Sequence, residues 1–174
     1  NKLKKKLPFF LKKFTNKKIF IENLALGSSE KKATFKQFSE SSSSTFSQID
    51  ENSTYFKKKY KFLNKKKEGN FYHEIEKKII PLANYLEEKK LQKIDFLKID
   101  TEGFEFEILL GLKEKIKNIK IIFFEHHYDN MIKKNYNFRD INYLLKSHKF
   151  RKIYKSKMPF RKTFEYIYIN TLIE

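Results

Sequence analysis

The sequence predicts an α/β domain whose sheet is mostly parallel and ends in an antiparallel hairpin. Two apolar, strand-like runs, residues 94–99 and 119–124, flank a segment with helical spacing at residues 104–117. A strand, a helix and a strand at this spacing form a right-handed unit with parallel strands. Residues 150–154 and 164–169 are also strand-like, and the short connection between them favours an antiparallel hairpin.

Length and composition fit a single domain over residues 1–174. Of the 174 residues, 40% are hydrophobic, which is enough to build one core. The chain contains no cysteine, so disulfides and cysteine-ligated metal sites are excluded. We find neither an apolar run of about 20 residues nor a signal peptide, and therefore expect a cytoplasmic protein without a transmembrane segment.

The formal net charge of +18 allows two interpretations. A basic surface with interleaved aromatic side chains could bind nucleic acid, or the charge could reflect a bias in composition and a solvated surface. Arginine, which nucleic-acid readers favour, occurs only at Arg139, Arg151 and Arg161. We therefore expect no specific nucleic-acid partner. A non-enzymatic basic module that binds nucleic acid or anionic surfaces stays as the alternative function.

The amino-terminal part predicts a helix, two strands and a serine-rich loop. Apolar residues within 2–14 recur at three- and four-residue steps, which is typical of an amphipathic helix. Residues 18–25 and 33–38 are β-prone. The serine-rich residues 39–47 could be a flexible linker or a flap over a site.

The middle of the chain is harder to interpret. Residues 48–78 show no sustained periodicity, so we expect irregular structure with at most a short helix, and we treat residues 39–78 as a loop or insertion within the domain. A short helix is expected over residues 84–92, capped by Asn84. A further helix is expected over residues 138–147, before the hairpin.

Ionisable side chains follow the two predicted parallel strands. Asp100 and Glu102 come after the first strand, and Glu125, His126 and His127 come at the end of the second. Ligands bind outside the carboxyl ends of the strands in open α/β sheets. Adjacent parallel strands lie about 4.8 Å apart, so both acidic ends would open on one crevice if the two strands are neighbours.

Lys98 interrupts the first of these strands, whose apolar residues suggest burial on both faces. Side chains alternate along a strand, so Lys98 and Asp100 should share a face. A lysine there must pair or reach a cleft, because burying a lone charge is costly. Beside Asp100 it would favour the ionised carboxylate.

Three other interpretations of these residues stay open. Asp100 and Glu102 could cap the helix that begins near Phe104. The run that begins at Glu125 could be a polar loop. Asp100, Glu125 and a histidine could also hold a hard divalent metal ion, although our prediction includes no metal site.

Five segments together carry a resemblance to a known family. Residues 94–105 read IDFLKIDTEGFE, residues 109–111 read LLG, and residues 121–127 read IIFFEHH. This ordered set resembles the FkbM family of S-adenosylmethionine-dependent methyltransferases. The sequence NLALG at residues 23–27 looks like the family's third strand with its Ala-Leu exit, and residues 41–45 look like its serine-rich loop. The resemblance covers most of the chain.

The resemblance implies a Rossmann-like class I methyltransferase sheet, and it also exposes an absence. The family's glycine-rich Asp-x-Gly-Ala-Asn-x-Gly loop and its Glu-Pro strand end are not in this sequence, whose four glycines form no cluster. We therefore expect a carboxy-terminal fragment that lacks the first two strands. Its sheet should have a gap where the two missing strands would lie, or the strand at residues 19–25 should take a different position in the sheet. Unpaired strand edges would then favour self-association.

The resemblance also implies a function. The family member would move a methyl group from S-adenosylmethionine to a hydroxyl, on a sugar or a glycan. Asp100 would be the general base or would orient that base. Glu102 would be the partner of Asp100, and Lys98 would tune the electrostatics of the site. Ala25 and Leu26 would lie near the adenine of the cofactor. Three residues would line the acceptor: Glu125, His126 and His127. A second hypothesis is that the chain is inactive because it cannot hold the cofactor.

Overall fold

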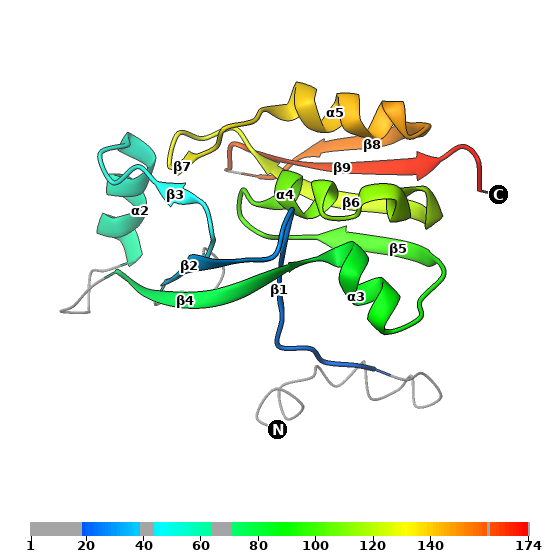
Figure 1. Cartoon of the computed structure of the whole chain (residues 1–174). Coiled ribbons are helices and arrows are strands. Elements are labelled where there is room, and N and C mark those ends of the chain that lie inside the picture. Colours follow the sequence, from blue (N-terminus) through cyan, green and yellow to red (C-terminus); the bar gives the residue numbers. More distant parts are fainter. Residues whose placement is uncertain (1–18, 39–43, 64–70, 160, 174) are drawn as a thin grey trace.

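The computed structural model describes residues 19–38, 44–63, 71–159 and 161–173. Within them it contains three separate sheets and several short helices (Figure 1). The fold is mixed α/β, as expected. The helix predicted for residues 2–14 and most of the serine-rich loop lie outside the described residues.

The largest sheet has four strands in the order β5-β6-β9-β8. These are β5 (Ile94–Ile99), β6 (Ile119–His127), β9 (Thr163–Asn170) and β8 (Phe150–Lys157). Strands β5 and β6 are parallel neighbours, whereas β9 pairs antiparallel with both β6 and β8. The predicted parallel pair and the carboxy-terminal hairpin are both confirmed.

The prediction of a mostly parallel sheet is wrong for the described residues. Two strand pairs are parallel, β5–β6 and β1–β4, and the other four pairs are antiparallel. The reason is the length of the connections. Parallel neighbours need a crossover connection of about a dozen residues or more, usually with a helix, whereas the short loop between β8 and β9 makes these two strands antiparallel.

The second sheet is built from β1 (Ala25–Gly27), β4 (Tyr72–Pro81) and β2 (Lys31–Phe38). Strand β4 lies in the centre, parallel to β1 and antiparallel to β2. The strand expected over residues 18–25 is therefore shorter and later than predicted. Strand β1 pairs with β4 only over Ala25–Gly27, and residues 19–24 do not continue the ladder although β4 extends back to Tyr72.

The segment at residues 48–78, expected to be irregular, is largely ordered where it is described. It contains β3 (Gln48–Ile49), α2 (Thr54–Leu63) and most of β4. Strand β3 pairs with β7 (Ile132–Lys133), which lies far along the chain. These elements enclose a second, smaller core made of Phe38, Phe56, Phe71, Met131 and Ile132. The sequence pattern did not predict β4 because half of its residues are exposed and four of these are charged.

The helix expected over residues 104–117 is divided into α4 (Glu105–Leu110) and the 3₁₀-helix η3 (Lys113–Asn118). The division falls at Gly111, where the chain touches the other sheet. A Cβ atom on Gly111 would lie only 2.0 Å from the carbonyl oxygen of Gly27. The N–H of Ala83 donates to the carbonyl of Gly111 at 2.9 Å. The break thus lets the helix pack closely on β1.

Two more helices complete the fold. Helix α3 (Leu82–Glu88) begins directly after Pro81, so the prediction that Asn84 caps it is wrong. Pro81 is the N-cap residue with an extended backbone, and a proline there costs no helical hydrogen bond because the first N–H groups of a helix have no intrahelical acceptor. Helix α5 (Phe138–Ser147) confirms the predicted range.

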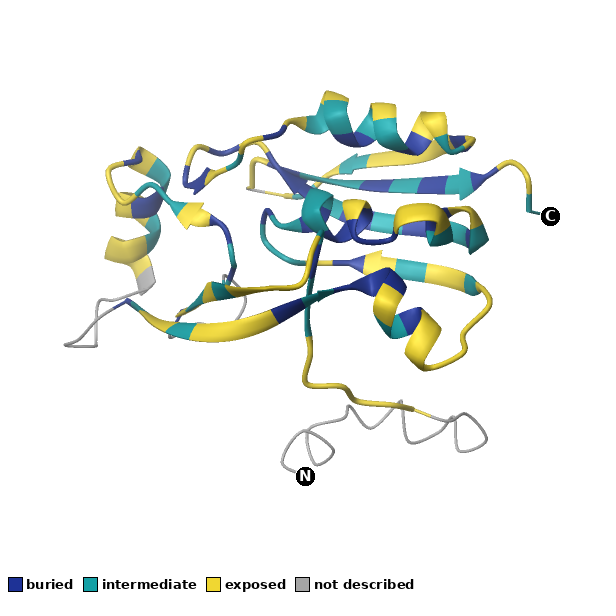
Figure 2. Cartoon of the chain, in the orientation of Figure 1, coloured by how far each residue is buried: buried dark blue, intermediate teal, exposed yellow. Residues whose placement is uncertain are grey.

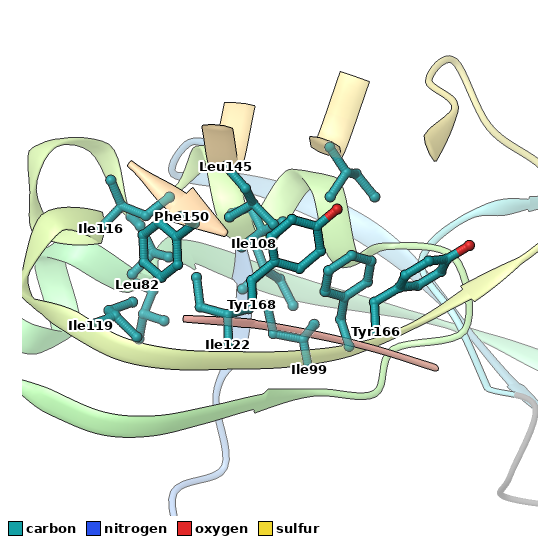
Figure 3. Packing of buried hydrophobic residues seen from close by; sticks show 14 of the residues in the cluster. Leu82, Ile99, Ile108, Ile116, Ile119, Ile122, Leu145, Phe150, Tyr166 and Tyr168 are labelled. Carbon is teal, nitrogen blue, oxygen red and sulfur yellow. The ribbon is translucent and has the colours of Figure 1, made fainter. Parts of the chain in front are cut away.

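The main core lies between the helices and one face of the four-stranded sheet (Figure 3). Leu145 of α5 and Ile108 of α4 pack with Ile122 and Tyr168 of the sheet, and all four are buried. The prediction that β5 is buried on both faces is wrong, because Phe96 remains 53% exposed and the face of β5 that it shares with Lys98 is open (Figure 2).

No strand of the β1-β4-β2 sheet is hydrogen-bonded to the four-stranded sheet in the described part of the chain. Strands β1 and β5 are each at the edge of their sheet, so each has one unpaired side. The two sheets meet instead through α4, which packs on β1 and on β6. This arrangement agrees with the expected gap in the sheet.

Candidate active site

The turn that follows β5 carries two of the candidate catalytic residues and has an unusual backbone. Glu102 and Gly103 have φ angles of 48° and 89°, in the left-handed region that favours glycine. Three hydroxyl groups hold the turn. Thr45 donates to the carbonyl of Glu102 at 2.8 Å, and Ser47 and Tyr136 donate to the carbonyl of Gly103 at 2.7 and 2.9 Å.

Thr45 and Ser47 lie at the end of the predicted serine-rich loop. Both side chains are buried, and each contacts a carbonyl oxygen of the turn. The described end of this loop therefore stabilises the turn at residues 102–103. These contacts connect the second sheet to the carboxyl end of β5.

Lys98, Asp100 and Glu125 form the first group of ionisable residues. The Lys98 Nζ donates to Asp100 Oδ2 at 3.0 Å, which confirms that the two side chains share a face. The register pairs Ile99 with Phe124, so Asp100 and Glu125 follow in adjacent positions. Both acidic strand ends therefore open on the same edge, as the sequence predicted.

The electrostatics of this group follow from its position. The hydrogen bond from Lys98 to Asp100 raises the pKa of Lys98. Burial raises the pKa of Glu125, the negative charge of Asp100 raises it further, and Lys98 opposes both. Lys98 and Asp100 are each nearly half exposed, so both can reach a ligand from solvent.

Glu102, His127 and Asp129 form a second group, which is largely buried. Glu102 Oε2 lies 3.3 Å from His127 Nε2, and His127 Nδ1 lies 3.2 Å from Asp129 Oδ2. Thr163 Oγ1 also lies 3.2 Å from His127 Nδ1. The imidazole is thus held between two carboxyl groups, and Glu102 pairs with His127 rather than with Asp100.

Each member of this group has a shifted pKa. Burial alone would lower the pKa of His127, but the hydrogen bond with Asp129 and the charge of Glu102 together raise it. Burial raises the pKa of Glu102, and His127 partly offsets that. Burial alone would raise the pKa of Asp129, yet hydrogen bonds from His127 and from the N–H of Met131 lower it.

His126 lies apart from both groups. Side chains alternate along β6, so His126 faces the helices while Glu125 faces the other side. Its Nδ1 lies 2.6 Å from Glu105 Oε1, and both side chains are almost completely buried. The ring of Tyr128 packs edge-on against it. The structure therefore does not bring His126 together with Glu125.

Two acidic residues that contact the histidines, Asp129 and Glu105, were not predicted from the sequence. Asp129 lies in the loop after β6, and its role depends on the bend that returns it to His127. Glu105 is the last residue of the EGFE sequence at residues 102–105, so its place in the motif was an available signal. The remaining oxygen of Glu105, Oε2, has no hydrogen-bond partner in the described structure.

Ala25 and Leu26 occupy different environments. Ala25 lines a cavity of about 420 Å³ together with Phe35, Phe46 and Ile80, whereas Leu26 packs against the main core. The two aromatic rings of this cavity lie 4.8 Å apart. The lining also includes the polar residues Asn23, Lys77 and Lys78. The placement of adenine near Ala25 and Leu26 stays a prediction, and the family's glycine-rich loop and Glu-Pro strand end are not in this sequence.

Among the residues that the structure describes, no three His, Asp or Glu side chains gather in a way that could hold a metal ion. The alternative metal site built from Asp100, Glu125 and a histidine is therefore not supported. None of the described helices is long and apolar enough to cross a bilayer.

The fold and the site define an α/β domain with ionisable residues at the carboxyl ends of two parallel strands. The sequence model of the methyltransferase FkbM domain matches residues 4–152. The chain therefore belongs to the FkbM methyltransferase family, and its mixed sheets are compatible with a methyltransferase-like fold. No curated protein and no solved structure matches the chain. The family match favours a methyltransferase over a non-enzymatic basic module.

Proposed function

We propose that this domain takes part in S-adenosylmethionine-dependent methylation of a hydroxyl group on a sugar or a glycan. The observation that carries the proposal is the adjacent placement of Asp100 and Glu125 at the carboxyl edge of β5 and β6, in a chain of the FkbM family. This edge is where open α/β sheets bind their ligands.

S-adenosylmethionine, when bound, supplies an electrophilic methyl group. The chain itself must position the hydroxyl and accept its proton, because a neutral hydroxyl is a weak nucleophile. We assign the proton to the Asp100 carboxylate, which is accessible to solvent and is paired with Lys98 at 3.0 Å. Glu102 supports the same edge from its buried position beside His127.

Glu125 is proposed to line the acceptor side directly, and His127 is proposed to act on that side through Glu102. Glu125 stands next to Asp100 on the edge of the sheet and can accept hydrogen bonds from acceptor hydroxyls. His127 acts through Glu102, which it contacts at 3.3 Å. His126 would then act only through its buried contact with Glu105.

The test compares two aspartates of the same strand region. Methyl transfer from S-adenosylmethionine to a panel of sugars is measured for the full chain, for Asp100→Asn and for Asp95→Asn. Asp95 is exposed and pairs with Lys93 at the opposite end of β5. We expect Asp100→Asn to lower kcat by about 10²- to 10⁴-fold, and Asp95→Asn to have no effect. Equal turnover in the two variants would remove Asp100 from the proposal.

The competing hypothesis is that the chain is inactive because it cannot hold the cofactor. Titration calorimetry with S-adenosylhomocysteine separates the two. Micromolar binding that weakens when Phe35→Ala opens the cavity at Ala25 supports the proposed function. If binding is absent and no sugar is methylated, the chain as given is not an active methyltransferase.

A further inference from the structure

A second cavity, of about 450 Å³, borders the turn after β5, and none of the proposed catalytic or acceptor-lining residues lines it. Gly103 and Phe104 of the turn form one part of its wall. The rest of the wall comes from β2, β3, β7, α4 and the loop residues next to β3 and β7, so the cavity lies where the second sheet meets the carboxyl end of β5. It is therefore adjacent to Glu102 in the chain.

The charges that line this cavity are mostly positive. Three lysines, Lys31, Lys133 and Lys134, face one acidic residue, Glu107, which gives a formal charge of +3 − 1 = +2. Glu107 already accepts a hydrogen bond from Ser28. The cavity thus has an excess of cationic groups.

Two of these lysines lack an acidic partner in the part of the chain that the structure describes. Neither Lys31 nor Lys133 takes part in an ion pair there. The neighbouring Lys32 pairs with Glu76 at 2.8 Å. The lack of an acidic partner is therefore specific to these cavity lysines, because a neighbouring lysine of the same surface does form an ion pair.

The third lysine is fixed in place. The Nζ of Lys134 donates to the carbonyl of His127, and its side chain is half-buried. Burial lowers the pKa of Lys134, and the negative charges of Glu105 and Asp129 oppose that. An anion bound nearby would favour the charged form of this lysine.

Uncharged donors complete the lining. Gln48 stands directly across the β3–β7 ladder from Lys133, so their side chains lie on the same face. Asn135 lines the cavity as well. Amide and ammonium N–H groups donate hydrogen bonds, and carboxylate and phosphate oxygens accept them. Donors of both kinds that line one cavity are therefore suited to binding an oxyanion.

We propose that this cavity binds an oxyanion, a phosphate or carboxylate group carried by the methyl acceptor, so that the acceptor is an acidic sugar. The assignment of the ligand as the acceptor rests on the proposed function. Gly103 lines the cavity and directly follows Glu102, so a sugar anchored by its acidic group would hold a neighbouring hydroxyl at the catalytic edge.

The test is a binding titration of the full chain without a methyl donor. The probes are glucose 6-phosphate, glucuronate and glucose, which differ in the oxyanion that they carry. Two double variants remove the same amount of charge: Lys31→Gln with Lys133→Gln at the cavity, and Lys146→Gln with Lys162→Gln as the control. Lys146 and Lys162 are exposed and do not line the cavity. Circular dichroism checks that every variant is folded.

We expect at least one acidic probe to bind, and we expect the glucose titration to show no saturation. The cavity variant should weaken the acidic probe by about tenfold or more, equivalent to about 1.4 kcal/mol, and the control by less than about twofold. Preference for glucose 6-phosphate or for glucuronate identifies the oxyanion. Equal weakening by both double variants, or binding of glucose as tight as that of the acidic probes, would overturn the proposal.

Failure of this inference can be told apart from failure of the proposed function. If the chain methylates a neutral sugar and neither acidic probe binds, only the inference fails. If the acidic probe binds through the two lysines but no sugar is methylated, the oxyanion site stands and the proposed function fails.

Discussion

Gly103 is the residue on which the geometry of the candidate site depends most directly. Its φ of 89° is strained for any residue with a side chain, and an added Cβ would lie 2.6 Å from Cγ2 of Ile132. The neighbouring Glu102 has a φ of 48° and bears part of the same turn. The turn therefore needs glycine for its backbone and for the close approach of β7.

We expect Gly103→Ala to lower the free energy of unfolding by about 2–4 kcal/mol, because backbone strain and overpacking add. Urea unfolding measures the loss. In an Ile132→Ala background the clash is removed and only the backbone strain remains, so the penalty of Gly103→Ala should become smaller. An unchanged penalty in that background would mean that Ile132 does not restrict the site.

His127 should make the stability of the protein depend on pH. Its pKa is raised in the folded protein, so its contacts with Glu102 and Asp129 stabilise the fold fully below the pKa of an unfolded histidine, about 6.5. This contribution is lost as the pH rises through the raised pKa. The free energy of unfolding should therefore fall as the pH increases above about 6.5.

Urea unfolding across this pH range tests the prediction. His127→Gln should flatten the pH dependence, while His73→Gln at an exposed position of β4 should leave it unchanged. If the slope persists in His127→Gln, another group is responsible for it.

At the scale of elements, α5 begins with a complete capping box. The Asn137 side chain accepts from the N–H of Arg139 at 2.7 Å, and the Asp140 carboxylate accepts from the N–H of Asn137 at 2.7 Å. The cap fixes the start of the helix that covers the main core through Ile141 and Leu145. The helix is thus anchored at its end nearest to β7.

Replacing Asn137 with alanine should lower the free energy of unfolding by about 1 kcal/mol, because one helical N–H loses its acceptor. Asn130→Ala is the matched control, since Asn130 is exposed and its side chain makes no hydrogen bond in the described structure. Thermal or urea unfolding compares them. Equal losses in the two variants would contradict a specific role for the cap.

At the scale of the whole molecule, the open edges of β1 and β5 are the most prominent feature. Phe96 on β5 is 53% exposed beside one of these edges. Unpaired edges next to exposed aromatic side chains are templates for association. We therefore expect the protein to self-associate through β5.

Sedimentation velocity at several protein concentrations tests this. Phe96→Lys should shift the protein towards the monomer, because charged side chains protect strand edges. Tyr143→Lys is the control, because Tyr143 is 77% exposed on α5 and lies on another element. Association that is equally sensitive to both changes would point to nonspecific apolar contact.

Several features of the fold and the site could not be predicted from the sequence. Strand β4 was missed because its exposed, charged side chains hide the strand pattern. The shared position of Glu102 and His127 was missed because it depends on the pairing of distant segments. His126 was grouped with Glu125, although alternation along β6 separates them on opposite faces. Asp129 gave no local signal of its contact with His127.

The sequence by itself determined the parallel pair at residues 94–99 and 119–124, the terminal hairpin and the acidic residues at both strand ends. These depend on short-range apolar patterns that fix local structure. Only the tertiary structure decided which ionisable residues meet. Lys98 lies beside Asp100, Glu102 beside His127, and Glu105 beside His126. The three pairs occupy different environments because strand alternation and the packing of β3, β7 and α4 keep them apart.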